Sequence, residues 1–363
     1  GGRCNVTHAC NNPRVLTSHY PRGEKNLIGP FHRWTVRDTV EWFESRGVPL
    51  KTESDGRMFP KTDRSETIVH CLQRTAEELG VDIRLKTEVH TLEKANDTSW
   101  QIALADGAEI SAKFVLLATG GIRNGAGVRL AGALGHDMVP AAPSLFTFKT
   151  SNPLIQDLAG ISVRDAGVRI EGLPWRSRGP CLITHWGLSG PGILRLSSLA
   201  ARELAERDYH FDCQVNWCGE AGREEIESQL QAARERHPKK RVRSGTKDWI
   251  LPSRLWQRMV RLAKVDEETT WANLPREERR QLAEILVASR FEVRGKTMNK
   301  EEFVTAGGIA LSEVDFKTME SRRCPGLYFA GEVLDIDGIT GGFNFQAAWT
   351  TSLLAGRAAS GIE

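Results

Sequence analysis

An apolar strand that leads directly into a glycine-rich loop and a helix is the feature that most constrains how this chain can fold. The strand covers residues 327–330, and Gly331 and Glu332 follow it at once. The loop ends at Gly341 and Gly342, and residues 343–359 have the pattern of a helix. Glycines let a backbone approach a flat ligand closely, and a helix N-terminus favours negative charge. The run therefore predicts an α/β fold with a ligand site where strand and helix meet.

The alternative for this run is an ordinary strand, turn and helix with Glu332 on the surface. We favour the ligand site because suitable residues occupy every position from 326 to 344. Glu332 would then accept hydrogen bonds from sugar-like hydroxyls. Asp335 and Asp337, inside the loop, are predicted to form turns rather than to act as acids.

A second apolar run, residues 114–118, predicts a strand that is buried on both faces of a sheet. It ends in Thr119 and Gly120, small residues past which a cofactor can approach the backbone. Near the N-terminus, Arg3 can pair with a phosphate and Asn5 can bind polar edges. These two sites are weaker evidence than the C-terminal run when each is taken alone.

Local patterns predict further elements between these sites. Asp63 and Glu66 have capping-box spacing before a helix that Gly80 ends. Residues 81–85 have the composition of a short strand. Asp106-Gly107 lies between two β-rich runs and predicts a hairpin turn.

With 363 residues the chain is long enough for two or three lobes. Short strands broken by Gly and Pro begin near residue 144, a charged and helix-rich stretch begins near 220, and β texture returns after 290. The order predicts a nucleotide-binding domain interrupted by two insertions. The predicted parts are residues 1–143 with 296–363, a β-rich substrate lobe of 144–219 with 290–295, and a helical insert of 220–289.

The net charge of only +3 argues against a dedicated nucleic-acid binder, so no nucleic-acid partner is expected. No apolar run approaches the length that crosses a bilayer, so no membrane partner is expected either. Seven scattered cysteines fit a reducing cytoplasm. Cys213 and Cys218 lie near His210, but the spacing matches no standard zinc pattern, and we expect no metal. The basic segment 237–243 is most simply a solvated loop.

Seven segments in order along the chain resemble one known family. They are GGRCNVT (1–7), GRMFP (56–60), VLLATGG (115–121), LGHDMVPAAPSL (134–145), THWGLSGPGILRLS (184–197), VTAGGIA (304–310) and PGLYFAGEVLDIDGITGGFNFQAAWTT (325–351). The chain resembles the aminoacetone-oxidase-like FAD-binding family of NAD(P)/FAD-dependent oxidoreductases. That family opens with a strand, a GxGxxG turn and a helix that hold the FAD pyrophosphate. This chain is expected to lack that unit.

The resemblance implies an α/β FAD/NAD(P)-binding Rossmann-like domain and an FAD-dependent oxidoreductase. The expected reaction moves a hydride from NAD(P)H, or from an organic amine or alcohol, to a small-molecule acceptor. His185, in the turn of residues 184–191, is the predicted proton donor. The predicted cofactor-binding residues are Gly2, Arg3, Cys4, Asn5, Val89, Thr119, Gly120, Gly331, Glu332, Gly341, Gly342, Phe343 and Asn344. Cys4 is expected to be a packed thiol, and Val89 to contact adenine through its backbone.

Two other functions stay open from the sequence. One is an inactive fragment or scaffold that has kept the fold and lost flavin. The other is an RNA-modifying flavoprotein that holds RNA through the basic segment 237–243 and the helical insert. Salt-dependent RNA binding would favour the second of these.

Overall fold

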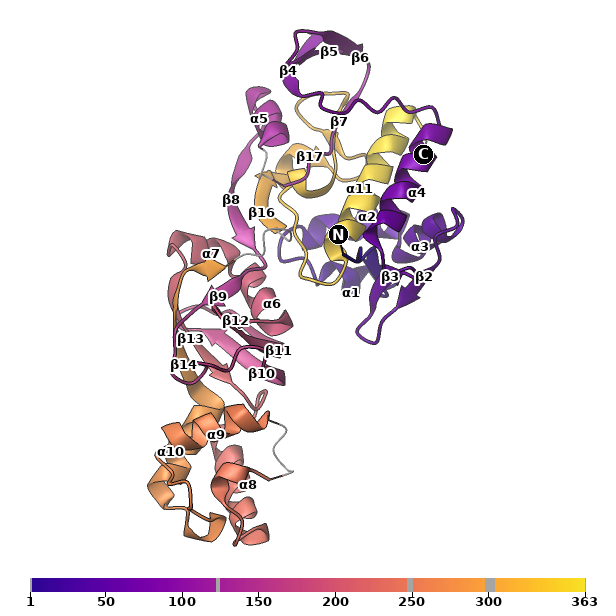
Figure 1. Ribbon diagram of the computed structural model, residues 1–363. Helices are drawn as coiled ribbons and strands as arrows, with labels where there is room; N and C mark the ends of the chain where they lie inside the picture. The colour runs from indigo at the N-terminus through magenta and orange to yellow at the C-terminus, as the bar shows by residue number, and fades with distance from the viewer. Residues whose placement is uncertain (1, 122–124, 247–250, 298–303, 363) are drawn as a thin grey trace. The chain divides into compact units, whose positions relative to one another are not determined.

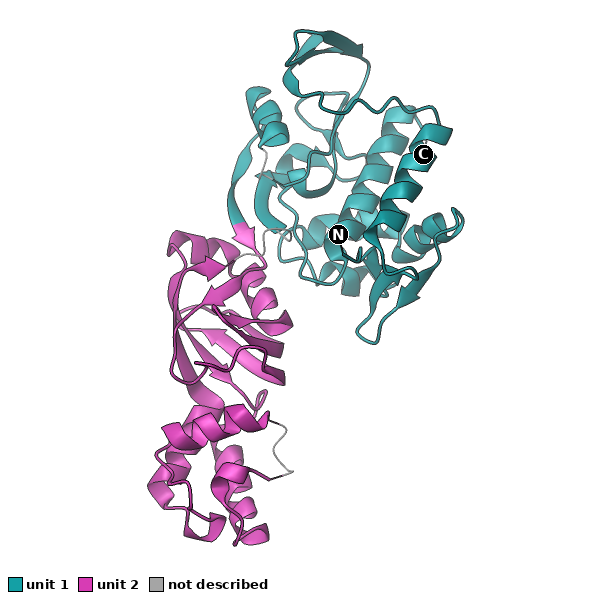
Figure 2. Cartoon of the chain, in the orientation of Figure 1, with its two compact units in different colours: residues 1–142, 304–363 teal, residues 143–303 magenta. Residues whose placement is uncertain are grey.

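The computed structural model describes residues 2–121, 125–246, 251–297 and 304–362. The chain divides into two compact units, one of Gly1–Ala142 with Val304–Glu363 and one of Pro143–Phe303 (Figure 2). Each unit is described by itself. The expected three-part division, with residues 220–289 as a separate insert, stays a prediction.

The centre of the first unit is a sheet of four strands in the order β17-β18-β19-β7. β19 (Leu327–Phe329) and β7 (Val115–Leu117) are parallel neighbours, and Leu117 lies opposite Phe329. β17 (Val314–Asp315) and β18 (Glu320–Ser321) continue the sheet in antiparallel fashion. α11 (Phe343–Ser360) packs against β19 and the short helix η5 (Gly331–Val333) that follows it. The predicted strand–loop–helix run is therefore confirmed.

The strand predicted from residues 114–118 is confirmed as β7, but its burial on both faces is not. Leu116 is 42% exposed, because β7 is the last strand of the described sheet and nothing in the described residues pairs with its outer edge. The apolar pattern of residues 114–118 thus predicted the strand correctly but not the exposure of Leu116.

Other elements of the first unit surround this sheet (Figure 1). A three-stranded sheet has the order β1-β3-β2, a second has the order β4-β5-β6, and β8 pairs with β16. Their bounds are β1 Thr7–His8, β2 Leu50–Thr52, β3 Arg57–Pro60, β4 Val89–Asn96, β5 Ser99–Leu104, β6 Glu109–Ala112, β8 Met138–Ser144 and β16 Val304–Ile309. The helices are α1 Pro13–Thr17, α2 Glu24–Arg33, α3 Val36–Glu44, α4 Ser65–Glu78 and α5 Ala126–Ala133.

Two local predictions for this unit were wrong and one is confirmed. Asp63 does not cap α4: its φ is 55°, and its carboxylate pairs with Lys51 instead. Residues 81–85 form no strand, since no described strand lies beside them, and their apolar side chains are more than half exposed. The hairpin turn at Asp106-Gly107 joins β5 to β6, and the Ala108 N–H donates to the Asp106 carboxylate at 3.0 Å.

The second unit is built on a seven-stranded antiparallel sheet in the order β14-β13-β10-β11-β12-β9-β15. Its strands are β9 Thr147–Lys149, β10 Ser162–Ile170, β11 Arg176–Thr184, β12 Gly187–Ser189, β13 His210–Asn216, β14 Ser289–Arg294 and β15 Lys296–Thr297. Its helices are α6 Pro191–Leu199, α7 Ala201–Glu206, α8 Arg223–Arg236, α9 Ser253–Leu262 and α10 Arg276–Ala288. One continuous apolar core joins the sheet to α8, α9 and α10, which gather at one end of it (Figure 1).

Trp271 should be a main source of stability for the helical end of the second unit. Its side chain is fully buried and lies 6.2 Å from the Trp256 ring. We expect Trp271→Ala to lower the free energy of unfolding by about 3–5 kcal/mol, the usual cost of removing a large buried aromatic. Trp186→Ala, at a position 60% exposed, should change it by less than about 0.5 kcal/mol.

Urea unfolding of both variants, followed by tryptophan fluorescence and circular dichroism, measures the difference. Equal effects of the two substitutions would mean that the core does not depend on Trp271.

Candidate functional site

The N-terminus of α11 is shaped by two glycines in conformations that other residues avoid. Gly341 and Gly342 have φ values of 137° and 94°. A Cβ on Gly342 would lie 2.5 Å from the Thr7 carbonyl oxygen. No described side chain caps the helix. The N–H groups of its first turn therefore face outward with the positive end of the helix dipole, an arrangement suited to negative charge.

Two asparagine side chains fix the glycine-rich loop against its surroundings. Asn5, oriented to satisfy both ends of its amide, accepts from the Gly342 N–H at 2.9 Å and donates to the carbonyls of Thr7 and Met58. Asn344 accepts from the Gly338 N–H at 2.7 Å and donates to the Gly338 carbonyl at 2.9 Å. Both amides are thus used by the protein, and a direct contact of either with a cofactor stays a prediction.

Phe343, the first residue of α11, lies among three ring side chains. Its ring centroid is 4.7 Å from that of His8 and 4.3 Å from that of His19, with both pairs stacked. The Tyr20 hydroxyl donates to the Phe343 carbonyl at 2.5 Å. Gly56 is required beside this cluster, because a Cβ there would lie 2.4 Å from the His8 ring. Phe343 therefore helps to form the wall of the site, and a ring contact with cofactor stays a prediction.

A buried polar network lies one turn further along α11. Gln346 accepts from the Thr7 hydroxyl at 2.6 Å and donates to the hydroxyls of Thr39 and Thr350 at 3.0 and 3.1 Å. Thr350 in turn donates to the Trp34 carbonyl at 3.2 Å. Sequence reasoning missed this network, since its members come from three separate segments and share no local pattern. A buried network in which every polar group is hydrogen-bonded favours a single packing of the elements that it joins.

Among the described residues, Arg22 and Asp337 form the most buried ion pair. The guanidinium donates through Nε and Nη2 to both carboxylate oxygens, and Asp337 has no exposed side-chain surface while Arg22 has 10%. The prediction that Asp337 merely forms a turn was wrong. Asp335 is likewise buried, and its carboxylate accepts from the Gly307 N–H at 2.9 Å. No local signal in the sequence pairs positions 315 residues apart.

The ends of β7 and β19 bring together a second group of predicted residues. A Cβ on Gly121 would lie 3.0 Å from the Thr305 hydroxyl and 3.2 Å from a Glu332 carboxylate oxygen. Gly120 has a φ of 73° and open space where a side chain would be. Thr119 packs its hydroxyl against Gly127. Two neighbouring strand ends thus present backbone and one carboxylate to the same place, as ligand sites at strand carboxyl ends do.

Glu332 is the ionisable group of this second cluster. Burial raises the pKa of its carboxyl above the usual range, the negative charge of Asp337 raises it further, and the Gly121 N–H opposes both by hydrogen bonding. Gly331, just before it, donates its N–H to the Thr351 hydroxyl of α11 at 3.0 Å. The helix and the strand end are therefore joined directly.

The remaining predicted residues of the first unit have their own partners. Arg3 pairs with Glu53 at 2.5 Å and Asp63 at 3.2 Å and stacks 4.1 Å above the Phe59 ring. The carbonyl of Gly2 accepts from the Ser65 N–H, and that of Val89 accepts from Arg129. Burial raises the pKa of the Cys4 thiol to about 11, so it stays protonated at neutral pH. Their roles in cofactor binding stay predictions.

His185 belongs to the second unit, at the tip of the hairpin that joins β11 to β12. Thr184 pairs with Gly187 in register, which leaves His185 and Trp186 as the two turn residues. The Thr184 hydroxyl accepts from the N–H groups of Trp186 and Gly187, each at 3.2 Å, and stabilises the turn. Both turn side chains are exposed. The hairpin presents an imidazole to solvent, and its predicted role as proton donor is untested.

The residues of the first unit fit a flat, negatively charged cofactor in two respects. The first turn of α11 has uncapped N–H groups, and Gly120 leaves open space beside Glu332. At Gly341 and Gly342 the missing side chains instead make room for the Phe343 ring and the Thr7 carbonyl. The glycines thus have two different purposes. Within the described residues, no group of three or more His, Cys, Asp or Glu side chains could hold a metal ion.

Fold and site together define an α/β protein of the dinucleotide-binding class. Residues 1–358 match the family model described as the HI0933-like protein Rossmann domain. The chain therefore belongs to the HI0933-like Rossmann-domain family, an FAD-binding flavoprotein family. In the part of the chain that the structure describes, no helix is both long and apolar enough to span a bilayer.

Three relatives align over almost the whole chain. A ribosomal RNA dihydrouridine synthase from Escherichia coli (strain K12) is 29% identical over 97% of this chain and 85% of its own length. One from Haemophilus influenzae is 28% identical over 97% and 86%. A 3-dehydro-bile acid delta(4,6)-reductase from Clostridium scindens is 27% identical over 99% and 88%.

One solved structure, that of the Diels-Alderase PyrE3 in the biosynthetic pathway of pyrroindomycins, matches 99% of this chain. It has 12% sequence identity and a TM-score of 0.31, and this chain spans 60% of its length.

The Arg22–Asp337 interaction should contribute strongly to the free energy of unfolding of the first unit. We expect Asp337→Leu or Arg22→Met alone to cost about 3–5 kcal/mol, because each leaves an uncompensated buried charge. The double variant Arg22→Met with Asp337→Leu should recover most of that loss, since no buried charge remains. Denaturant unfolding of the four proteins gives the coupling energy. Additive losses would show that the two side chains do not stabilise each other.

Proposed function

We propose that this protein is an FAD-dependent reductase that adds a hydride and a proton across a carbon–carbon double bond conjugated to a carbonyl group. Family membership supports a redox role. The names of the three relatives describe a synthase of dihydrouridine and a reductase of 3-dehydro bile acids. Both names imply reduction of a double bond next to a carbonyl, although the two substrates differ greatly in size. NAD(P)H is the proposed electron donor, and the aminoacetone-oxidase-like subgroup is a finer assignment that we also propose.

The observation that carries this proposal is the uncapped first turn of α11, set by Gly342 beside the strand end that bears Glu332. FAD, when bound, supplies a hydride acceptor and donor. The N–H groups of the first turn would hold its negative charge, and Glu332 would accept hydrogen bonds from its hydroxyls. Gly120 would let its planar part approach the end of β7.

The proton required by the reaction would come from the protein. Hydride addition to the carbon far from the carbonyl leaves an enolate, which is neutralised by a proton at the carbon next to the carbonyl. We propose His185 as the donor of that proton, since an imidazole N–H can donate a proton and the hairpin turn presents the side chain to solvent. The two hydrogens then balance the reduced bond.

A uracil ring in RNA is the second candidate substrate. The observation that favours it is the identity of 29% and 28% to two ribosomal RNA dihydrouridine synthases. Uracil has a double bond conjugated to a carbonyl, so the same hydride and proton additions apply. The first candidate is a free small molecule with such a double bond, and the two differ only in what lies beyond the reacting ring.

Gly342→Ala should weaken FAD binding by at least about tenfold. A Cβ 2.5 Å from the Thr7 carbonyl, on a residue with a φ of 94°, must displace the first turn of α11. Gly356→Ala is the matched control: it lies in the same helix with open space around it, and should keep FAD affinity while adding about 0.5–1 kcal/mol of stability.

The measurement is the visible spectrum of the full-length protein titrated with FAD, followed by anaerobic reduction with NADH and NADPH. Flavin bands that bleach with either nucleotide support the proposal. A full-length protein that binds no FAD would overturn it and leave the scaffold alternative.

Replacing His185 should slow turnover without loss of flavin. We expect His185→Gln to lower kcat about 10²–10⁴-fold, the usual contribution of a positioned proton donor. Trp186→Phe, its neighbour in the turn, should keep kcat within about threefold. Stopped-flow reduction of an enone substrate, with the flavin spectrum as loading control, checks both. Unchanged turnover in His185→Gln would remove this role.

A further inference from the structure

Positive charge is concentrated in one segment of the second unit. Residues 234–264 hold eleven Lys and Arg against two Asp and Glu, and the rest of the chain holds 38 basic against 44 acidic residues (49 less 11, and 46 less 2). The near-neutral total therefore conceals a basic segment in an otherwise acidic protein. The absence of a nucleic-acid partner, expected from the total, does not follow from the distribution.

Several cations of this segment already have partners within the protein. Arg254 and Arg258 of α9 donate to the backbone carbonyls of Asp157 and Pro153, at 2.6 and 2.5 Å. These two side chains attach α9 to the strand-bearing part of the unit. Arg241 pairs with Glu268, and Arg243 pairs with Glu267 at 2.5 Å.

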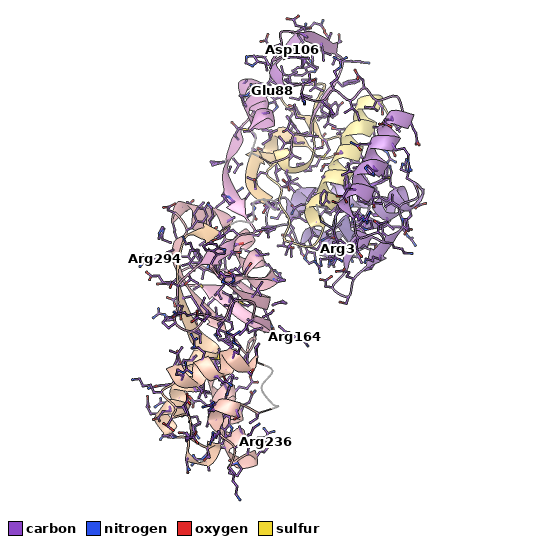
Figure 3. All side chains as sticks on the ribbon, in the orientation of Figure 1. Arg3, Glu88, Asp106, Arg164, Arg236 and Arg294 are labelled. Atoms are coloured by element: carbon purple, nitrogen blue, oxygen red, sulfur yellow. The ribbon has the colours of Figure 1, made fainter. Side chains whose placement is uncertain are left out.

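Four exposed cations are left over, besides the half-buried Arg234. Lys239, Lys240, Arg261 and Lys264 are exposed, and none forms an ion pair or side-chain hydrogen bond with a described residue. Because the neighbouring glutamates are already paired with Arg241 and Arg243, they do not neutralise these four charges. Figure 3 shows Arg236, at the end of α8, in the helical part of the second unit; its guanidinium donates to the Ala232 carbonyl.

The loop that carries two of the free lysines is ordered by hydrogen bonds on both sides. The Val242 N–H donates to the Thr269 carbonyl at 3.0 Å, and the Trp271 N–H donates to the Lys240 carbonyl at 2.9 Å. The buried Trp256 indole donates to the Val242 carbonyl at 2.8 Å. Lys239 and Lys240 are thus held on a fixed backbone, which lowers the entropy lost on binding.

One of the four cations, Arg261, lies at the end of α9 that faces the loop of residues 237–246. Arg261 and Arg243 line the same shallow hollow with Glu267, so the end of α9 lies next to the loop. The hollow is only about 60 Å³, too small for a nucleotide. Exposed charges beside a hollow of this size fit an extended polyanion, whose phosphates are contacted one by one. Leu262 is the one large apolar side chain exposed among the described residues of this segment, too little for insertion into a membrane.

We propose that the surface formed by Lys239, Lys240, Arg261 and Lys264 binds the phosphate backbone of RNA. The inference rests on the second candidate function, in which the reduced ring is a uracil of an RNA. It assigns substrate recognition to the helical end of the second unit and leaves the chemistry to the α11 site. The contacts are to phosphates, so they position the RNA without reading its sequence.

The test uses the full-length, FAD-loaded protein and a fluorescent uridine-containing RNA of thirty nucleotides. Anisotropy titrations from 50 to 300 mM KCl give the affinity and its salt dependence. The quadruple variant Lys239→Ala, Lys240→Ala, Arg261→Ala, Lys264→Ala should bind at least tenfold more weakly at 100 mM KCl. Its slope of log K against log salt should be shallower by about 3, at roughly 0.7 per lost contact.

The matched control removes four exposed cations of the first unit, Lys25, Arg37, Lys61 and Lys86, each to Ala. It removes the same net charge, and it should bind RNA within about twofold of the wild type. If the two quadruple variants lose equal RNA affinity, the effect comes from net charge alone and the proposal is overturned. So would wild-type binding without salt dependence. The wild type should not bind vesicles of 70% phosphatidylcholine and 30% phosphatidylglycerol. If it does, and the quadruple variant does not, the surface would be assigned to a membrane instead.

Enone reduction measured on the same variants separates this inference from the proposed function. The quadruple variant should reduce a small enone as fast as the wild type, since none of its four side chains belongs to the flavin site. A wild type that binds RNA through these cations but shows no flavin reduction would overturn the proposed function alone. Full reductase activity without RNA binding would overturn only the proposal that this surface binds RNA.

Discussion

The close approach of the N-terminal segment to the first turns of α11 is the contact on which the rest of the site depends. The Thr7 carbonyl occupies the space that a side chain at position 342 would need, and Asn5 bonds the N–H of the same residue. One and two turns further on, Gln346 bonds Thr7 and the Trp349 indole donates to the Val6 carbonyl at 3.0 Å. Each contact is polar, buried or half-buried, and directional. Together they set the direction in which the free N–H groups of the helix point.

Electrostatics adds a second constraint to the same loop. The Arg22–Asp337 pair has almost no access to solvent, so its charges are fixed and weakly screened. Asp337 contributes to the raised pKa of Glu332, a residue whose carboxylate faces the ends of β7 and β19. Asp337 therefore affects the protonation state of Glu332 as well as forming the buried ion pair.

The sequence predicted those parts of this structure that depend on neighbours close in the chain. The strand and closing helix around residues 327–360 and the Asp106-Gly107 turn follow from local composition, and they are confirmed. The failures all depend on distant partners. Asp63 pairs with Lys51 instead of capping α4, and Asp337 pairs with Arg22 from another segment. Residues 81–85 had the composition of a strand without a described strand to pair with.

Two further sequence-based predictions failed because they treated residues in different surroundings as alike. The glycines of the two apolar runs were assigned a single purpose, yet Gly342 accommodates the protein backbone while Gly120 faces open space. The near-neutral net charge argued against a nucleic-acid binder, yet basic residues are concentrated between 234 and 264. A cofactor site needs buried, fixed partners, and the first unit provides them around α11. A polyanion surface needs exposed, unpaired cations on a rigid support, and these are found in the second unit. Buried, paired groups and exposed, unpaired cations cannot occupy the same place. Separate units can each provide one of the two.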